Sequence, residues 1–241
     1  MAWQCTGRNN EELVENLAKA HIISDPRVRQ AMLKVDRGDY SPEGPYVDCP
    51  QPIGYMATIS APHIHAHSIS MIAKYIKPTS RVLDIGCGSG YVTHVLAQLI
   101  IDGATEPSQA TGYVVGIDHI PELVDFSTQN VSKSQSGRDF LESGKIRFVL
   151  GDGRKGFEAS APYDAIHVGA AAVALHDELV EQLASPGAMY IPVEDEEKKI
   201  LDIINEQFIW EVKKDENGNV TKQRIFAVNY VPLTDVPDFN A

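Results

Sequence analysis

The chain has 241 residues, of which 43% are hydrophobic and 22% charged, so it can bury a substantial core and does not belong to the disordered class. Its formal net charge of −12 disfavours long-range attraction to nucleic acid or to anionic lipid. Its three cysteines are widely separated, which fits a reducing compartment and offers no metal-ligand spacing.

The first residues do not show the basic segment followed by an apolar segment that is typical of a signal peptide. No apolar run approaches the ~20 residues of a membrane span. We therefore expect a soluble, cytoplasmic protein that has neither a membrane nor a nucleic acid as its partner.

Two helices are expected first, over residues 9–20 and from Asp25 onward. Asn10 is expected to cap the first helix, and Asp25 with Pro26 opens the second. Residues 36–52 hold several prolines and glycines, which predicts a loop that wraps around another part of the molecule.

A third helix is expected from Pro62 to about residue 76. Thr58 and Ser60 then lie on the approach to its N-terminus, where unpaired backbone N–H groups attract an anion such as a substrate carboxylate. The spacing equally allows Ser60 to be no more than the cap of this helix.

Three histidines, His63, His65 and His67, alternate along this same helix. Alternate residues on a helix project about 200° apart, so these side chains cannot converge on one metal ion. We expect no metal site here.

The segment RVLDIGCGSGYVTHVL, residues 81–96, predicts a buried strand, a tight turn and a helix from about residue 91. Gly86, Gly88 and Gly90 follow the pattern Gly-x-Gly-x-Gly, whereas a dinucleotide fingerprint reads Gly-x-Gly-x-x-Gly. Asp84 precedes them, where it would repel a phosphate but suits the ammonium and sulfonium of S-adenosylmethionine (SAM). An ordinary strand-to-helix turn is the alternative.

Two further acidic residues end strands. Asp118 closes a strand over residues 111–120, and its two oxygens can hold the hydroxyls of a ribose. Asp152 follows a strand over residues 145–151, where a carboxylate and an adjacent backbone N–H can bind adenine. Asp84 and these two residues all fall at carboxyl ends of strands, where parallel sheets bind ligands.

Strands and helices alternate as far as residue 194, which predicts a parallel sheet with helices on both faces. Further helices are expected over residues 91–101, 121–134 and 175–184, and further strands over 163–171 and 188–193. Polar connections are expected at 102–112 and 136–144, and a turn at Pro186-Gly187. Residues 200–212 and 223–231 then predict an antiparallel pair around Asn217-Gly218, followed by a tail that leaves the sheet edge.

The segment around Gly86 resembles the SAM-binding turn of class I methyltransferases. We therefore expect an α/β fold, a doubly wound (Rossmann-like) class I SAM-methyltransferase sheet with a C-terminal antiparallel strand pair and N-terminal helical additions. We expect a single domain over residues 1–241. Its parts are N-terminal helices with a substrate-side segment (1–78), a SAM-binding core (79–194), and C-terminal strands with a substrate-binding tail (195–241).

Six segments in order, spread over nearly the whole chain, resemble the protein-L-isoaspartate (D-aspartate) O-methyltransferases. They are IGYMATISAPHIHA, VLDIGCGSG, VVGIDHIPELVD, GDGRKG, PYDAIHVGAAA and YVPLTD. The first and the last separate this family from other SAM methyltransferases.

The resemblance implies a repair reaction. The methyl group of SAM goes to the free α-carboxylate of L-isoaspartyl, and more weakly D-aspartyl, residues of damaged proteins and peptides. The ester then collapses to a succinimide, which can reopen to normal aspartate. The resemblance further implies SAM as the cofactor, no metal, and a monomer.

It also implies roles for individual residues. Ser60 matches the active-site residue. The cofactor side comprises Ile59, His65, Asp84, Gly86, Gly88, Asp118, His119, Asp152, Gly153 and Thr234. The substrate side comprises Thr58, Ile59, Ser60, Ala61, Val231, Pro232, Leu233 and Thr234.

Three features depart from the family pattern: Met56, which stands where members often have Gly or a polar residue; Pro192-Val193-Glu194 in place of Pro-Val-Gly; and a C-terminus without an aromatic, basic tail. Two other functions compete with repair. One is methylation of a small molecule or RNA, against which the acidic charge argues. The other is a non-catalytic adaptor, which need not retain all of the matched site residues.

Overall fold

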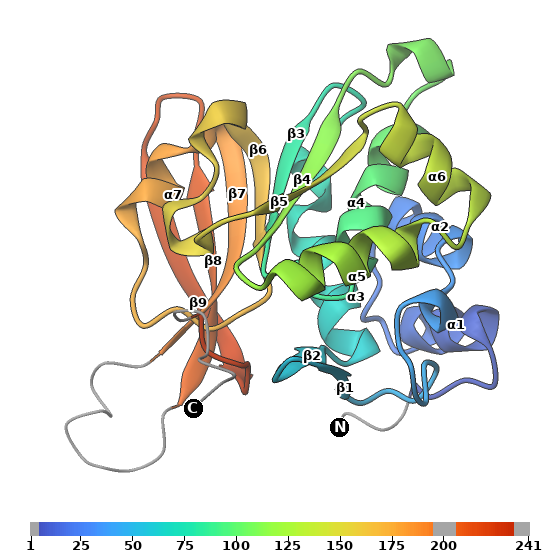
Figure 1. The fold of residues 1–241 in the computed structure, drawn as a ribbon. Coiled ribbons are helices and arrows are strands. Elements are labelled where there is room, and N and C mark those ends of the chain that lie inside the picture. The colour runs from blue at the N-terminus through green and yellow to red at the C-terminus, as the bar shows by residue number, and fades with distance from the viewer. Residues whose placement is uncertain (1–4, 195–205, 234–241) are drawn as a thin grey trace.

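The computed structural model describes residues 5–194 and 206–233 (Figure 1). A seven-stranded sheet forms its centre, in the order β5-β4-β3-β6-β7-β8-β9. The strands are β3 (Arg81–Ile85), β4 (Tyr113–Asp118), β5 (Ile146–Leu150), β6 (Tyr163–Val168), β7 (Leu183–Glu194), β8 (Gln207–Lys214) and β9 (Val220–Val228). A separate two-stranded sheet pairs β1 (Gln51–Gly54) with β2 (Ala57–Ile59).

The first five strands of the large sheet run parallel, and β8 pairs antiparallel with both β7 and β9. From β3 the chain moves outward through β4 to β5 and then returns to β6 on the other side of β3. The order of strands therefore reverses at β3, which is where open parallel sheets form a ligand crevice. The expected fold class, including the C-terminal antiparallel strands, is confirmed.

Most helices lie on one side of the sheet, with α7 alone on the other side in Figure 1. The helices are α1 (Asn10–Lys19), α2 (Pro26–Lys34), α3 (Pro62–Ile72), α4 (Tyr91–Asp102), α5 (Pro121–Val131), α6 (Gln135–Glu142) and α7 (Asp177–Glu181). Successive residues of β3 enter opposite cores: Val82 packs toward the helical side and Leu83 toward the α7 side. The sheet is thus buried on both faces, as parallel sheets require.

Several sequence predictions of local structure are wrong. Asn9 caps α1, because its side chain accepts the Glu12 N–H at 2.9 Å, whereas the expected cap Asn10 is buried. The segment expected to be a polar connection after residue 135 is helix α6, capped by Ser134 and anchored by the buried Phe140.

Other boundaries also differ. Helix α3 ends at Ile72 and continues as a short 3-10 turn, and α7 is shorter than expected. Pro186-Gly187 lies within strand β7, at an irregularity in its pairing with β6, rather than in a turn before the strand. The start of the predicted strand over 200–212 and the tail after Leu233 lie outside the described residues.

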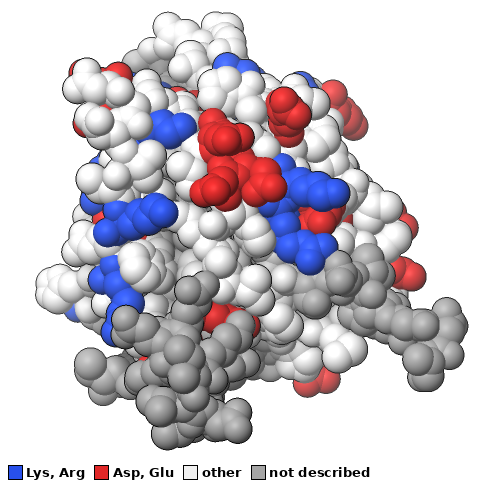
Figure 2. Space-filling model, turned by 90° about the vertical axis from the view of Figure 1, so that its left-hand side faces the viewer, with Lys and Arg blue, Asp and Glu red and all other residues white. Residues whose placement is uncertain are grey.

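On the side that carries α7 and the C-terminal strands, acidic and basic side chains are interspersed (Figure 2). Within the described ranges no helix combines the length and the apolar composition needed to cross a bilayer.

Candidate active site

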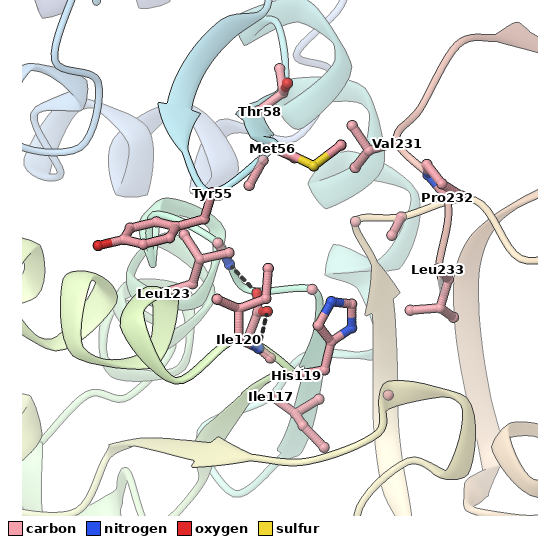
Figure 3. Close-up of a pocket in the computed structure, with 17 residues that line it drawn as sticks. Tyr55, Met56, Thr58, Ile117, His119, Ile120, Leu123, Val231, Pro232 and Leu233 are labelled. Atoms are coloured by element: carbon pink, nitrogen blue, oxygen red, sulfur yellow. Dashed lines mark hydrogen bonds between the residues drawn. The ribbon is translucent and has the colours of Figure 1, made fainter. Parts of the chain in front are cut away.

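Three cavities open beside the carboxyl ends of β3, β4 and β6, and Thr58 and Gly169 line all three. The main cavity, of about 270 Å³, is lined by residues that include Asp118, His119 and Leu123 (Figure 3). The inner pocket, of about 30 Å³, lies under the glycine turn. The outer groove, of about 510 Å³, runs along Ser60 and Tyr230.

The glycine turn after β3 brings the backbone close to the main cavity and the inner pocket. Gly86 donates its N–H to the Ile117 carbonyl at 2.8 Å, which ties the turn to β4. Gly90 has a φ of 83°, and a Cβ atom there would lie 2.9 Å from the Cβ of Ser127. Only glycine satisfies both the left-handed backbone and this close approach to α5.

Asp118 lies at the end of β4 with 7% of its surface exposed. Its Oδ2 accepts the Gly88 N–H at 3.0 Å and its Oδ1 accepts the Ile120 N–H at 3.2 Å (Figure 3). Burial raises the pKa of this carboxyl group, and the two backbone donors oppose that shift. The carboxylate also lines the main cavity, where its remaining lone pairs can accept hydrogen bonds from a ligand.

Asp152 does not line any of the three cavities. Its carboxylate forms an ion pair with the Arg154 guanidinium, at 2.9 Å for both nitrogen–oxygen contacts, and this partner holds the pKa of Asp152 below its usual value. The neighbouring Gly153 does line the main cavity, and a Cβ there would lie 2.3 Å from Cγ2 of Ile85.

Asp84 is buried in the wall of the inner pocket. Its Oδ2 accepts the Thr93 hydroxyl at 2.5 Å and its Oδ1 accepts Nδ1–H of His167 at 2.8 Å. Both oxygens thus have protein partners, and the carboxylate adds negative charge to the pocket. Sequence reasoning missed His167, although the pairing of β3 with β6 places it beside Asp84.

Ser60 is not the cap of α3. Ala61 occupies that position, and no side chain caps the helix. The first N–H groups of α3 are also taken, since His63 N donates to Asp48 Oδ1 at 3.0 Å and His65 N to the Ala61 carbonyl at 3.2 Å. The expected anion site at this helix N-terminus is therefore occupied by Asp48.

Ser60 instead lines both the inner pocket and the outer groove. Burial raises the pKa of the Tyr230 hydroxyl to about 12, and hydrogen bonds with Tyr190 and Ser60 act in the opposite direction. Tyr190 and Tyr230 are 3.1 Å apart at their hydroxyl oxygens. Sequence reasoning had not singled out either tyrosine, because only the tertiary fold brings residue 230 to residue 60.

His65 and Arg37 form a buried pair directly beside Ser60. Arg37 Nη2 donates to the Ser60 carbonyl at 2.7 Å, and Arg37 Nη1 lies 3.0 Å from His65 Nδ1. Burial, followed by the charge of Arg37, lowers the pKa of His65 well below its ordinary value. The sequence placed Arg37 only within a loop, and no local signal indicated its position.

The other histidines of α3 have unrelated contacts. Nδ1 of His63 bonds Asp48 Oδ1 at 2.7 Å, and the ring of His67 packs edge-on against Phe226. Within the part of the chain that the structure describes, no three His, Cys, Asp or Glu side chains are grouped as metal ligands would be.

The C-terminal tail reaches the site as an extended segment. The Ala171 N–H donates to the Val231 carbonyl at 2.8 Å, and the Leu233 N–H to the Ala171 carbonyl at 2.7 Å. Val231 lines both the main cavity and the outer groove, whereas Pro232 lines only the main cavity. Thr234 lies outside the described residues.

The structure thus gathers nearly all of the predicted site residues around one junction. Those that line at least one of the three cavities are Thr58, Ile59, Ser60, Ala61, His65, Asp84, Gly86, Gly88, Asp118, His119, Gly153, Val231, Pro232 and Leu233.

The strand order, the glycine turn after β3 and the acidic end of β4 define a Rossmann-like, SAM-dependent methyltransferase. Residues 8–237 match the family described as protein-L-isoaspartate(D-aspartate) O-methyltransferase, and the chain belongs to this family.

Individual relatives agree. The chain is 41% identical to a protein-L-isoaspartate O-methyltransferase of Caenorhabditis elegans over 97% of this chain and 96% of that protein. It is 44% identical to protein-L-isoaspartate O-methyltransferase 2 of Arabidopsis thaliana over 92% of this chain and 67% of the relative. A crystal structure from Plasmodium falciparum, described as a putative protein-L-isoaspartate O-methyltransferase in complex with S-adenosyl-L-homocysteine, superposes with a TM-score of 0.83. The two chains are 34% identical in sequence, and the superposition covers 95% of this chain and 99% of the Plasmodium chain.

Proposed function

We propose that this chain transfers the methyl group of SAM to the free α-carboxylate of L-isoaspartyl residues in damaged proteins and peptides, with D-aspartyl residues as weaker acceptors. The observation that carries this proposal is the meeting of three cavities at Thr58 and Gly169. The cavity proposed for the cofactor and the groove proposed for the peptide then adjoin at Thr58, Gly169 and Val231.

The residues of the main cavity and the inner pocket fit SAM. Asp118 can accept hydrogen bonds from the ribose hydroxyls, and Gly153 lets the backbone line the cavity while packing tightly against Ile85. The negative charge of Asp84 suits the cationic methionine end in the inner pocket. When bound, SAM supplies a methyl group on a positively charged sulfur.

The outer groove fits the acceptor. The N–H groups at the start of α3 are already bonded, and the Ser60 side chain, which lines the groove, can donate to the substrate carboxylate instead. Val231 lines the same groove as Ser60, where an extended peptide can lie against it.

The chemistry needs no general base. A carboxyl group with a pKa near ~4 is already ionised at neutral pH, so the nucleophile is ready when it binds. The protein contributes by aligning the carboxylate oxygen of the substrate with the methyl group of SAM and by excluding water from both groups.

Tritium transfer from labelled SAM tests the reaction on three peptides that differ only in L-isoaspartate, L-aspartate or D-aspartate at one position. We expect base-labile methyl esters on the isoaspartyl peptide, weaker labelling of the D-aspartyl peptide and none of the L-aspartyl peptide. Labelling of none of them, with SAM still bound, would contradict the proposal and favour another acceptor or a binding-only role.

We further infer that the whole chain forms one domain and works as a monomer in the cytoplasm, with isoaspartyl proteins as its partners rather than nucleic acid or membranes. Free thiols at Cys5 and Cys87, both buried, support a reducing compartment. Light scattering coupled to size-exclusion chromatography measures the oligomeric state, and a mass near 26.4 kDa is expected.

A further inference from the structure

Arg37 is a fully buried cation beside the candidate active site. Its guanidinium donates to the Ser60 carbonyl and to the His65 ring, and it lies 5.3 Å from the centre of the Tyr91 ring. Within the described residues no ion pair joins it to a carboxylate, and its Nε has no hydrogen-bond partner. The charge of the buried Asp48 acts on Arg37 from a distance, without a direct ion pair. A buried cation that no carboxylate contacts is costly to fold around, which calls for a role.

The contact with Arg37 determines the tautomer of His65. A guanidinium has only donors, so Nδ1 of His65 must be the acceptor of the 3.0 Å contact. The single proton of the neutral ring then resides on Nε2. Burial and the neighbouring charge lower the pKa of His65, which keeps the ring neutral at physiological pH. His65 is therefore an N–H donor in the wall of the inner pocket, beside Ser60.

The fold holds Arg37 in this position from the N-terminal side. Oδ1 of Asn10 accepts the Arg37 backbone N–H at 3.3 Å, while Nδ2 of Asn10 donates to the Met32 carbonyl at 2.9 Å. Helix α1 and the end of α2 are thereby linked to the segment that carries Arg37. The N-terminal helices thus support the site as well as covering the sheet.

We propose that Arg37 is a positioning residue for methyl transfer. It anchors the Ser60 backbone, holds His65 as an Nε2–H donor in the wall of the inner pocket, and places a positive charge behind the serine that receives the substrate carboxylate. This inference rests on the proposed function for the carboxylate, but the state of His65 is measurable without any substrate.

Two substitutions separate these effects. Arg37→Met removes the charge and both donors while keeping an unbranched apolar chain. Arg37→Lys keeps the charge, but its single nitrogen lacks the fork that reaches Ser60 and His65 together. Arg27→Met is the matched control, since Arg27 also donates to two backbone carbonyls, of Ala73 at 3.0 Å and Ile76 at 3.2 Å, yet contacts no site residue.

The first measurement is the tautomer of His65 by nitrogen and carbon NMR, with the His65→Gln protein used to assign the signal. We expect the Nε2–H form in the wild-type and Arg27→Met proteins. In Arg37→Met we expect loss of the pure Nε2–H signature. An unchanged His65 signature in Arg37→Met would overturn the proposal.

The second measurement is kinetic. For an isoaspartyl peptide we expect kcat/KM to fall about tenfold to hundredfold in Arg37→Met, the size expected when reacting groups are misplaced. The dissociation constant for S-adenosyl-L-homocysteine should stay within about twofold, because Arg37 does not line the main cavity. Wild-type kinetics in Arg37→Met, or an equal loss in Arg27→Met, would overturn the proposal.

If Arg37→Met does not fold, Arg37→Lys decides the matter: a folded protein with wild-type kinetics and an unchanged His65 would contradict the proposal. If the wild-type protein itself methylates no isoaspartyl peptide, the proposed function fails. The NMR result then still tests the arrangement of Arg37 and His65 independently.

Discussion

The two sides of the candidate active site are built in different ways. On the cofactor side, the glycine turn and Asp118 come from strand ends that are adjacent in the sheet, and backbone groups make most of the contacts. On the substrate side, Ser60 is surrounded by Arg37 and Tyr230, which come from distant parts of the chain and act through their side chains.

This difference indicates which substitutions should change SAM binding and which should change methyl transfer. The cofactor side depends on local backbone geometry, so a substitution there should alter SAM binding. The substrate side depends on long-range side-chain packing, so a substitution there should alter methyl transfer and leave SAM binding intact. Of the four predictions that follow, those at Asp118, Ser60 and Met56 test this separation, and the one at His94 tests the protonation of a buried histidine that belongs to neither side.

The largest effect is expected for Asp118→Ala. This change removes the proposed ribose acceptors and leaves the N–H groups of Gly88 and Ile120 without their partner. We expect the affinity for S-adenosyl-L-homocysteine, measured by calorimetry, to fall about hundredfold, the loss typical of an unpaired buried polar site.

Asp152→Ala is the matched control for Asp118→Ala. Its carboxylate pairs with Arg154 and does not line the cavity, so we expect the affinity to change by less than about threefold, as for a partly exposed ion pair. A large loss in Asp152→Ala would show that the carboxylate turns toward the adenine on binding, as the family resemblance implies.

Ser60→Ala is expected to have the next largest effect. Removing the hydroxyl should lower kcat/KM for an isoaspartyl peptide about tenfold or more, the contribution of one hydrogen bond to a charged group. The affinity for S-adenosyl-L-homocysteine should stay nearly constant. Ser70→Ala in helix α3, away from the three cavities, should change neither quantity. Loss of cofactor binding in Ser60→Ala would contradict the separation of the two sides.

A pH-dependent effect on stability is expected from His94, which neither side uses. Burial lowers the pKa of His94 from 6.5 to about 4, and Nδ1 accepts the Tyr40 hydroxyl at 2.5 Å. Because the unfolded chain binds the proton first, stability is lost as the pH falls from about 6.5 toward about 4, by up to about 3 kcal/mol in total.

Urea unfolding of the wild-type and His94→Gln proteins across this pH range measures that contribution. We expect a shallower decline with acid in His94→Gln, since only the difference between the two proteins reports His94. Parallel declines would show that His94 is not neutral in the fold.

The smallest effect is expected at Met56, which is 79% exposed and has a φ of 57° in the turn between β1 and β2. Figure 3 shows its side chain directed across the main cavity toward Val231. Met56→Gly should relieve backbone strain and stabilise the fold by about 1 kcal/mol, while the affinity for S-adenosyl-L-homocysteine falls a few-fold because an apolar wall of the main cavity is lost.

His21→Gly is the matched control for Met56→Gly. His21 has a φ of 58° in a turn far from the site, so its replacement should give the same stabilisation without a change in this affinity. A fall in both stability and affinity in Met56→Gly would show that Met56 supports the turn itself.

The sequence was sufficient for the family and the sheet, because those depend on short motifs. It also predicted a set of cofactor-side residues, most of which line the main cavity or the inner pocket. Gly86 and Gly90 follow Asp84 within a few residues of sequence. Each acidic residue proposed for the cofactor likewise stands at the end of its own strand, so the motif can be recognised locally. The same reasoning placed the strands β3 to β6 within a few residues.

It was insufficient where a residue's partner is distant in sequence. Asn10 looks like a helix cap, but it is buried because Arg37 and Met32 need its amide. The sequence did not predict helix α6, because its residues are mostly polar and Phe140 is the one large apolar side chain that it buries. Neither the pairing of His167 with Asp84 nor that of Tyr230 with Ser60 follows from spacing along the chain.

A crystal structure of the protein with S-adenosyl-L-homocysteine and an isoaspartyl peptide tests the central claim most directly. We predict the ribose hydroxyls on Asp118, the peptide carboxylate within hydrogen-bonding distance of the Ser60 hydroxyl, and the sulfur and the carboxylate facing each other beside Thr58 and Gly169. A peptide carboxylate bound elsewhere, with Ser60 making no contact to it, would contradict the account.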